Sequence, residues 1–289
     1  MTETPAFAQS GTAYRPPCDN LYIYYLEGRI PEQALTDIAA HIGTWEEDGF
    51  SFAFFSSPAD KEMGALVRTE PDLTLIDHYQ MRYEDWQGER VTTFRAGGFL
   101  VRPPWEPEEP GPRRVDTIPL LLDPGVVFGT GTHPTTRDCL AALELLYRDT
   151  AIQTVLDMGT GTGILAIAAA CLGSRHVAAV DLNRLAVQTA RRNIDLNGVG
   201  DHVVAVQGRA EQLVAVTADL LVANIHYDVM RYMLSTAGFK AKRHWILSGL
   251  LRSQARAVEQ LLKDAGGHVV KRWTRDHIWY TYLGYNGLR

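Results

Sequence analysis

From Thr154 onward, short apolar runs alternate with segments of helical periodicity. The alternation reads "TVLDM" then "ILAIAAACLG", "HVAAVDL" then "LAVQTARRNIDLNG", and "VVAVQG" then "ADLLVANI". Strands that alternate with helices in this way build a parallel sheet with right-handed crossovers. Because ligands of such sheets bind beyond the carboxyl ends of the strands, we expect the functional site there.

The first of these strands ends in a glycine-rich turn, "LDMGTGTG", with Gly159, Gly161 and Gly163 at alternate positions. A dinucleotide-binding turn places its third glycine one residue later, where this chain has Ile164. The spacing therefore favours a nucleoside without phosphate, although such a turn alone is often only a tight connection. Asp181 ends the next strand, where a carboxylate can accept hydrogen bonds from both ribose hydroxyls. Together these residues predict S-adenosylmethionine as the ligand.

The N-terminal part of the chain has a different pattern. Residues 1–19 are rich in Pro, Ser, Thr and Gly and predict a disordered tail. Residues 20–84 predict a small α+β domain, with strands in "LYIYYLE", "FSFAFF" and "LTLIDHYQMRYE" and a helix over 31–42, "PEQALTDIAAHI". Prolines and glycines make 85–115 a connector, and 116–289 is the ligand-binding domain.

Composition excludes several classes of function. Hydrophobic residues make up 46% and charged residues 21%, as in a globular protein with a sizeable core. The net charge of −6 disfavours nucleic acid and favours a basic protein or a small molecule as partner. Cys18, Cys139 and Cys171 are far apart, so neither a disulfide framework nor a metal site is indicated. The longest apolar run, "ILAIAAACL", is too short to cross a bilayer, and we expect a cytoplasmic location.

A second glycine-rich stretch, "DPGVVFGTGTHPTT", precedes the parallel-sheet pattern. With "LDMGTGTGILAIAA", "LVANI" and "ILSGLL" behind it in that order, the chain resembles the PrmA-type methyltransferases of ribosomal protein L11. The resemblance is dense from Asp123 to Leu251 and weak in the first eighty residues. It implies an α/β fold, in which a class I (Rossmann-like) seven-stranded methyltransferase domain follows a small α+β substrate-recognition domain.

The resemblance also implies a set of cofactor contacts: Thr136, Gly159, Asp181 and Asn224, with Gly161 in the same turn as Gly159. The two glycine-rich stretches would then face one ligand from different sides. Thr136 begins a predicted helix, where a hydroxyl and free backbone N–H groups can hold the carboxylate of the ligand. The amide of Asn224 can both donate and accept a hydrogen bond in the cleft.

The residues after Asn224 depart from related patterns. Many methyltransferases of planar nitrogens have a Pro-Pro-aromatic run there, and its absence favours an aliphatic amine as acceptor. Members of the resembled family usually carry small or aliphatic residues where this chain has His226, Tyr227 and Asp228. No catalytic residue is assigned, because His226 and Asp228 suit either proton transfer or a structural role. The loop residue His133 suits either bracing or substrate contact.

The expected function is methyl transfer from S-adenosylmethionine to lysine side chains and/or the N-terminal amine of a basic ribosomal large-subunit protein. The resemblance implies a cytoplasmic monomer that modifies the protein free of the ribosome, without metal, nucleic acid or membrane. A same-fold methyltransferase acting on a different protein lysine or a small-molecule amine is the alternative. A binding module that has lost catalysis is a second alternative, which the intact motif residues disfavour.

Overall fold

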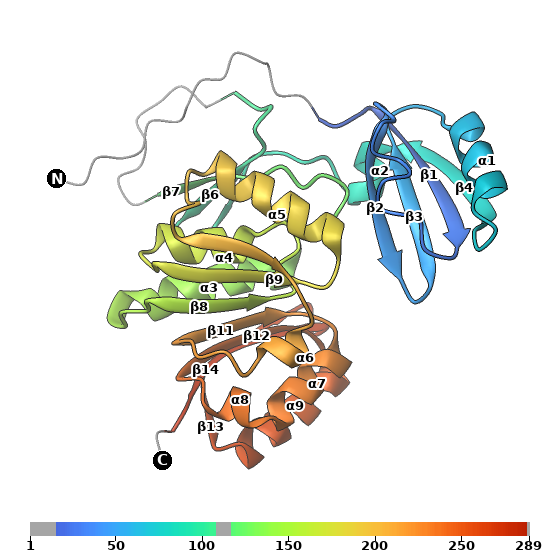
Figure 1. Ribbon diagram of the computed structural model, residues 1–289. Helices are drawn as coiled ribbons and strands as arrows, with labels where there is room; N and C mark the ends of the chain where they lie inside the picture. Colours follow the sequence, from blue (N-terminus) through green and yellow to red (C-terminus); the bar gives the residue numbers. More distant parts are fainter. Residues whose placement is uncertain (1–15, 108–116, 288–289) are drawn as a thin grey trace.

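The computed structural model describes residues 16–107 and 117–287, and Figure 1 traces the chain through an N-terminal module and a larger C-terminal domain. Most of the predicted tail and part of the predicted connector lie outside the described residues. No helix in the described part of the chain is both long and apolar enough to span a bilayer.

A seven-stranded sheet forms the centre of the C-terminal domain, in the order β10-β9-β8-β11-β12-β14-β13. The first five strands of this order are parallel, and β14 is antiparallel to both of its neighbours. This order confirms the predicted class I (Rossmann-like) α/β fold. The strands are β8 (Thr154–Met158), β9 (His176–Asp181), β10 (Val203–Gln207), β11 (Leu220–Asn224), β12 (His244–Leu251), β13 (Gly267–Arg275) and β14 (Trp279–Asn286).

Helices cover both faces of this sheet (Figure 1). Alternate residues of β8 enter different cores: Val155 packs with one layer of helices and Leu156 with the other. Burial on both faces explains why the parallel strands are almost continuously apolar. One layer contains α3 (Pro134–Asp149), α4 (Ile164–Cys171) and α5 (Arg184–Leu196). The other contains α6 (Ala210–Leu213), α7 (Tyr227–Ser235), α8 (Ala237–Lys240) and α9 (Arg252–Asp264).

The N-terminal module is an antiparallel sheet of order β2-β3-β1-β4 with one helix on one face (Figure 1). Met63 and Leu66 of that helix are buried in the core of the module. The three predicted strands are confirmed as β1, β3 and β4. The elements are β1 (Asn20–Glu27), β2 (His41–Glu47), β3 (Phe50–Phe55), α1 (Asp60–Thr69) and β4 (Thr74–Arg82).

The helix predicted over 31–42 is wrong. The segment forms successive turns, in which Ala34 N donates to Pro31 O at 2.9 Å, and β2 begins at His41. The Thr36 hydroxyl donates to Gln33 O at 2.9 Å, a side-chain bond that competes with helical hydrogen bonding. Pairing of the end of the segment with β3 overrides its helical periodicity.

The range predicted as a connector, 85–115, contains ordered elements. A three-stranded sheet is formed by β5 (Phe94–Ala96), β6 (Phe99–Arg102) and β7 (Ile118–Leu121). Phe99, Val101 and Leu120 are buried in the core that also contains residues of α3 and α4. This small sheet therefore packs on the C-terminal domain.

The short helix α2 (Tyr83–Gln87) links the two parts by donating hydrogen bonds to the first glycine-rich stretch. Tyr83 Oη and Gln87 Nε2 donate to Gly125 O at 2.6 and 2.8 Å. Trp86 Nε1 donates to Val126 O at 3.1 Å. The carbonyls just before Phe128 are thus held by the N-terminal side of the chain.

Candidate active site

The glycine-rich turn after β8 has a left-handed backbone. Gly159, Gly161 and Gly163 have φ angles of 71°, 55° and 86°, which side chains rarely adopt. A Cβ on Gly161 would lie 2.6 Å from the carbonyl oxygen of Phe128. The turn therefore lies directly against the first glycine-rich stretch, and glycine is required at Gly161 by both conformation and space.

The buried side chain of Asn193, on α5, joins the two glycine-rich stretches. Its Nδ2 donates to Thr162 O at 2.8 Å and to Asp123 O at 2.9 Å, and its Oδ1 accepts from Asp123 N at 2.9 Å. Thr162 Oγ1 also donates to Gly129 O at 2.7 Å. The structure thus brings the two stretches together at the carboxyl end of β8.

Asp181 lies beside this turn at the end of β9, as the sequence predicts. Its Oδ2 accepts from Gly161 N at 3.0 Å, and its Oδ1 accepts from Asn183 N at 2.9 Å. Burial raises the pKa of the carboxyl group, while backbone donors at Asn183, Gly161 and Leu182 oppose the rise. Each carboxylate oxygen has a further lone pair that can accept from a ligand hydroxyl.

Asp157, at the base of the turn, is the acidic residue that the sequence analysis did not select. Its Oδ2 accepts from Thr160 Oγ1 at 2.6 Å, and its buried Oδ1 has no hydrogen-bond partner within the described residues. Burial raises the pKa of this carboxyl group to about 7. The only signal in the sequence is its place just before the glycines, which does not reveal the unpaired oxygen.

Asn224 ends β11 and contacts the start of α3. Its Nδ2 donates to Thr135 Oγ1 at 3.2 Å. The backbone N–H of Thr136 donates to His133 O at 3.0 Å, and the predicted contact of Thr136 with a ligand carboxylate stays a prediction. The first turn of α3 is closed by this bond, which satisfies a donor that a helix start usually leaves unpaired. The Thr136 side chain is buried beside this turn.

His133 lies between two aromatic rings. Its ring meets Phe128 edge-on at a centroid distance of 5.6 Å and Trp279, from the start of β14, at 5.0 Å. Its Nδ1 pairs with Thr135 Oγ1 at 2.7 Å, and burial lowers its pKa. Phe128 is 63% exposed. His133 thus braces an aromatic wall, and Trp279, which is distant in sequence and belongs to no motif, could not be found from the sequence.

The residues after Asn224 lie at an exposed lip. His226 precedes α7, and its Nδ1 lies 3.7 Å from Asp228 Oδ2. Their side chains are 80% and 68% exposed. No catalytic role is assigned to either residue, and the choice between a structural role and proton transfer stays open.

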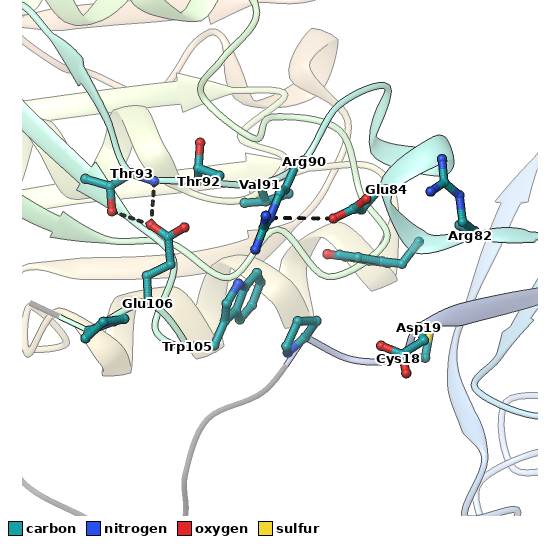
Figure 2. Close-up of a pocket in the computed structure, with 13 residues that line it drawn as sticks. Cys18, Asp19, Arg82, Glu84, Arg90, Val91, Thr92, Thr93, Trp105 and Glu106 are labelled. Atoms are coloured by element: carbon teal, nitrogen blue, oxygen red, sulfur yellow. Dashed lines mark hydrogen bonds and ion pairs between the residues drawn. The ribbon is translucent and has the colours of Figure 1, made fainter.

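A separate cavity of about 990 Å³ lies where the start of β1, α2 and residues 90–107 meet (Figure 2). Glu106 in its wall accepts from the backbone and hydroxyl of Thr93, and Arg90 lies 3.7 Å from Glu84. None of the residues predicted to contact the cofactor lines this cavity. Its size therefore gives no reason to place the cofactor there.

The family model for ribosomal protein L11 methyltransferase (PrmA) matches residues 51–285. The chain belongs to the PrmA family. The match spans β3 to β14 and so includes both glycine-rich stretches, Asp181 and Asn224.

Individual relatives of this chain carry the same family name. The ribosomal protein L11 methyltransferase of Desulfitobacterium hafniense is 36% identical over 220 residues, which are 74% of this chain and 69% of that protein. That of Bacillus pumilus is 38% identical over 175 residues, 60% of this chain and 55% of that protein. The matched region thus spans little more than half of the latter. A crystal structure of a ribosomal protein L11 methylase from Lactobacillus delbrueckii subsp. bulgaricus aligns with a TM-score of 0.60 and 28% identity, covering 68% of this chain and 98% of that one.

The cofactor of PrmA-type class I methyltransferases is S-adenosylmethionine, and the residues present here fit it. The Cβ positions of Gly159 and Gly161 are filled by Ile225 and by the Phe128 carbonyl, so these glycines let the turn pack tightly at the strand ends. Asp181 beside the turn offers acceptors for ribose hydroxyls. We therefore keep Gly159, Gly161, Asp181, Asn224 and the Thr136 hydroxyl as proposed contacts.

The Asp181→Ala variant is expected to bind S-adenosylmethionine more weakly by about 1.5 to 3 kcal/mol, because hydrogen bonds to a charged acceptor are lost. Isothermal titration calorimetry measures the change. Asp201→Ala, at an exposed aspartate beyond α5, is the control and should leave affinity unchanged. Equal affinities of the two variants would mean that Asp181 only orders the turn.

Proposed function

We propose that the chain transfers methyl groups from S-adenosylmethionine to amino groups of ribosomal protein L11, on lysine side chains and/or the N-terminal amine. The observation that carries the proposal is the family match over residues 51–285, which coincides with the paired glycine-rich stretches. The names of the curated relatives support the same substrate.

When bound, the cofactor supplies an electrophilic methyl group on a positively charged sulfur. A lysine acceptor must first lose a proton, which costs roughly 4.6 kcal/mol at pH 7 from its reference pKa. Partial desolvation against the aromatic wall of Phe128, His133 and Trp279 lowers the pKa of the amine. Asn224 donates through Nδ2 to Thr135, so its Oδ1 can accept from the incoming amine and align it.

In this proposal the two parts of the chain have different tasks. Residues 20–84 recognise the protein substrate, and residues 116–289 hold the cofactor and perform the chemistry. The substrate is the basic ribosomal protein before its assembly into the ribosome, and the enzyme acts as a cytoplasmic monomer without nucleic acid, metal or membrane. The placement of all proposed cofactor contacts after residue 116 supports this division.

One observation favours the alternative of a different protein lysine or a small-molecule amine as acceptor. The family match begins at residue 51, so β1 and β2 lie outside it.

The test of the proposed function is incubation of the protein with labelled S-adenosylmethionine and a ribosome-free bacterial extract, followed by mass spectrometry of the labelled products. Label on L11 is the expected result. Label confined to another protein or to a small amine would support the alternative, and cofactor binding with no labelled product would favour a binding module.

A further inference from the structure

The N-terminal sheet has a second face, opposite α1, that carries a cluster of aromatic rings. Directly paired residues of an antiparallel sheet share a face. The register pairs Tyr25 and Trp45 with Phe52, and pairs Tyr79 with Ile23 on the same face. We call the cluster formed by five aromatic side chains of this face the aromatic platform: Tyr25, Trp45, Phe50, Phe52 and Tyr79.

The platform rings are packed together yet accessible. The rings of Tyr25 and Phe52 stack with centroids 4.7 Å apart and an interplanar angle of 8°, and the Phe50 ring centroid lies 5.3 Å from that of Tyr25. Tyr79, on the edge strand β4, is 46% exposed, and the other four rings are partly exposed. Trp45 and Phe52 pack against the cluster that contains Val126, Val127 and Leu185, so this inner side of the platform contacts the C-terminal part of the chain. Tyr25, Phe50 and Tyr79 form the accessible outer side, and neighbouring exposed aromatic rings indicate a contact surface.

Carboxylates surround the platform. Glu27 and Glu47 both pair with Phe50, and Asp77 pairs with Tyr25, so all three share the face of the rings. All three are exposed, and none forms an ion pair within residues 16–107 and 117–287. Residues 20–84 contain twelve acidic and four basic side chains, a net charge of −8, whereas the whole chain has −6. The negative charge of the protein is therefore concentrated in this module.

The platform adjoins the rim of the cofactor site. Asn183, two residues after Asp181, donates from Nδ2 to Glu46 O of β2 at 3.3 Å. A Cβ on Gly43 of β2 would lie 2.3 Å from Leu185 Cδ1, which shows how closely the strand and the start of α5 approach. A protein seated on the platform would therefore lie beside the cofactor end of the catalytic domain.

We propose that the aromatic platform and its three carboxylates dock a basic protein surface that presents lysine side chains. Ammonium groups are attracted to the faces of aromatic rings, and the surrounding carboxylates add charge complementarity. The inference rests on the proposed function, because it assigns the lysine-rich partner to the substrate of the same enzyme.

The test compares two triple charge reversals in the full-length protein. The first is Glu27→Lys/Glu47→Lys/Asp77→Lys on the platform. The matched control reverses three exposed carboxylates elsewhere on the module and changes the net charge by the same amount: Asp37→Lys/Glu62→Lys/Asp72→Lys. Steady-state methylation of purified L11 and calorimetric binding of L11 are measured at low and physiological salt.

The platform variant should raise KM and Kd for L11 about tenfold or more, since three favourable charge contacts become repulsive. Its kcat at saturating L11, its affinity for S-adenosylmethionine and its thermal unfolding should match the wild type. The control should change KM less than about threefold through long-range charge alone. Equal effects of the two triples would overturn the proposal, and so would a platform variant that changes self-association instead of L11 binding.

A second pair of variants tests the rings. Tyr79→Ser should weaken binding of L11 by about threefold to fivefold, while Tyr79→Phe retains it, because the ring face provides the attraction. Equal Kd values for both would overturn the role of the ring. If the wild type binds L11 and the platform triple does not, but no methylation occurs, the proposed function fails while the docking surface stands. If every variant methylates L11 with the wild-type KM, the proposed function stands and the docking surface fails.

Discussion

Replacing Gly161 by alanine is expected to weaken S-adenosylmethionine binding by about a hundredfold, near 2.7 kcal/mol. The residue has a φ of 55°, and an added Cβ would lie 2.6 Å from the carbonyl oxygen of Phe128. Since that carbonyl belongs to the backbone, the two glycine-rich stretches must separate to admit the methyl group. Calorimetric titration of the variant with S-adenosylmethionine measures the loss.

Gly198→Ala is the matched control. Gly198 has a similar φ of 63°, but nothing lies within 4 Å of a Cβ built there. It should therefore lose about 1 to 2 kcal/mol of stability from backbone strain without losing cofactor affinity. If both variants bind the cofactor like the wild type, the turn does not form its binding surface.

The second large effect concerns Asp157 and the pH dependence of stability. Burial raises the pKa of its carboxyl group from 3.8 to about 7, so between these pH values the folded chain holds a proton that the unfolded chain has lost. The contribution of this carboxyl group to the free energy of unfolding is fully present below pH 3.8 and is lost as pH rises toward 7. From the pKa difference, the loss is on the order of 4 kcal/mol.

Asp157→Asn is expected to remove this decrease in the free energy of unfolding with rising pH. The amide oxygen can still accept from Thr160, and no charge is buried at pH 7 or above. Urea denaturation of the cofactor-free protein from pH 4.5 to 8 should give the variant a higher free energy of unfolding than the wild type at the upper end. The difference between the two proteins cancels the titration of other groups. Parallel curves would show that Asp157 is solvated or paired in solution.

The parallel strands could be predicted because burial on both faces makes each one a short apolar run between turn signals. The same topology explains the predicted site: Asp181 and Asn224 end the two strands that flank β8, and the carboxyl ends of these parallel strands meet at one edge. The glycine spacing predicts the turn. The fold is needed to show that Gly161 lies against Phe128 of the first glycine-rich stretch and that Gly159 lies against Ile225.

Other features depend on contacts that no local pattern encodes. Trp279 reaches His133 because β14 inserts between β12 and β13, and the sequence of a final strand does not say which side chain faces the site. The segment 31–42 has helical spacing, yet only pairing of β2 with β3 decides its conformation. Phe99 and Val101 lie in a stretch whose prolines suggest a linker, although both side chains belong to the catalytic core.

The hydrogen bonds from α2 to Gly125 O and Val126 O have a thermodynamic consequence. Gly125 and Val126 lie just before Phe128, whose carbonyl abuts the glycine turn. Any movement of the N-terminal module that strains these bonds therefore alters the free energy of the loop that faces the cofactor. Linkage is reciprocal, so a protein substrate that changes cofactor affinity by some factor has its own affinity changed by the cofactor by that same factor. The order in which the protein substrate and the cofactor bind would then affect the kinetic route to the ternary complex but not its stability.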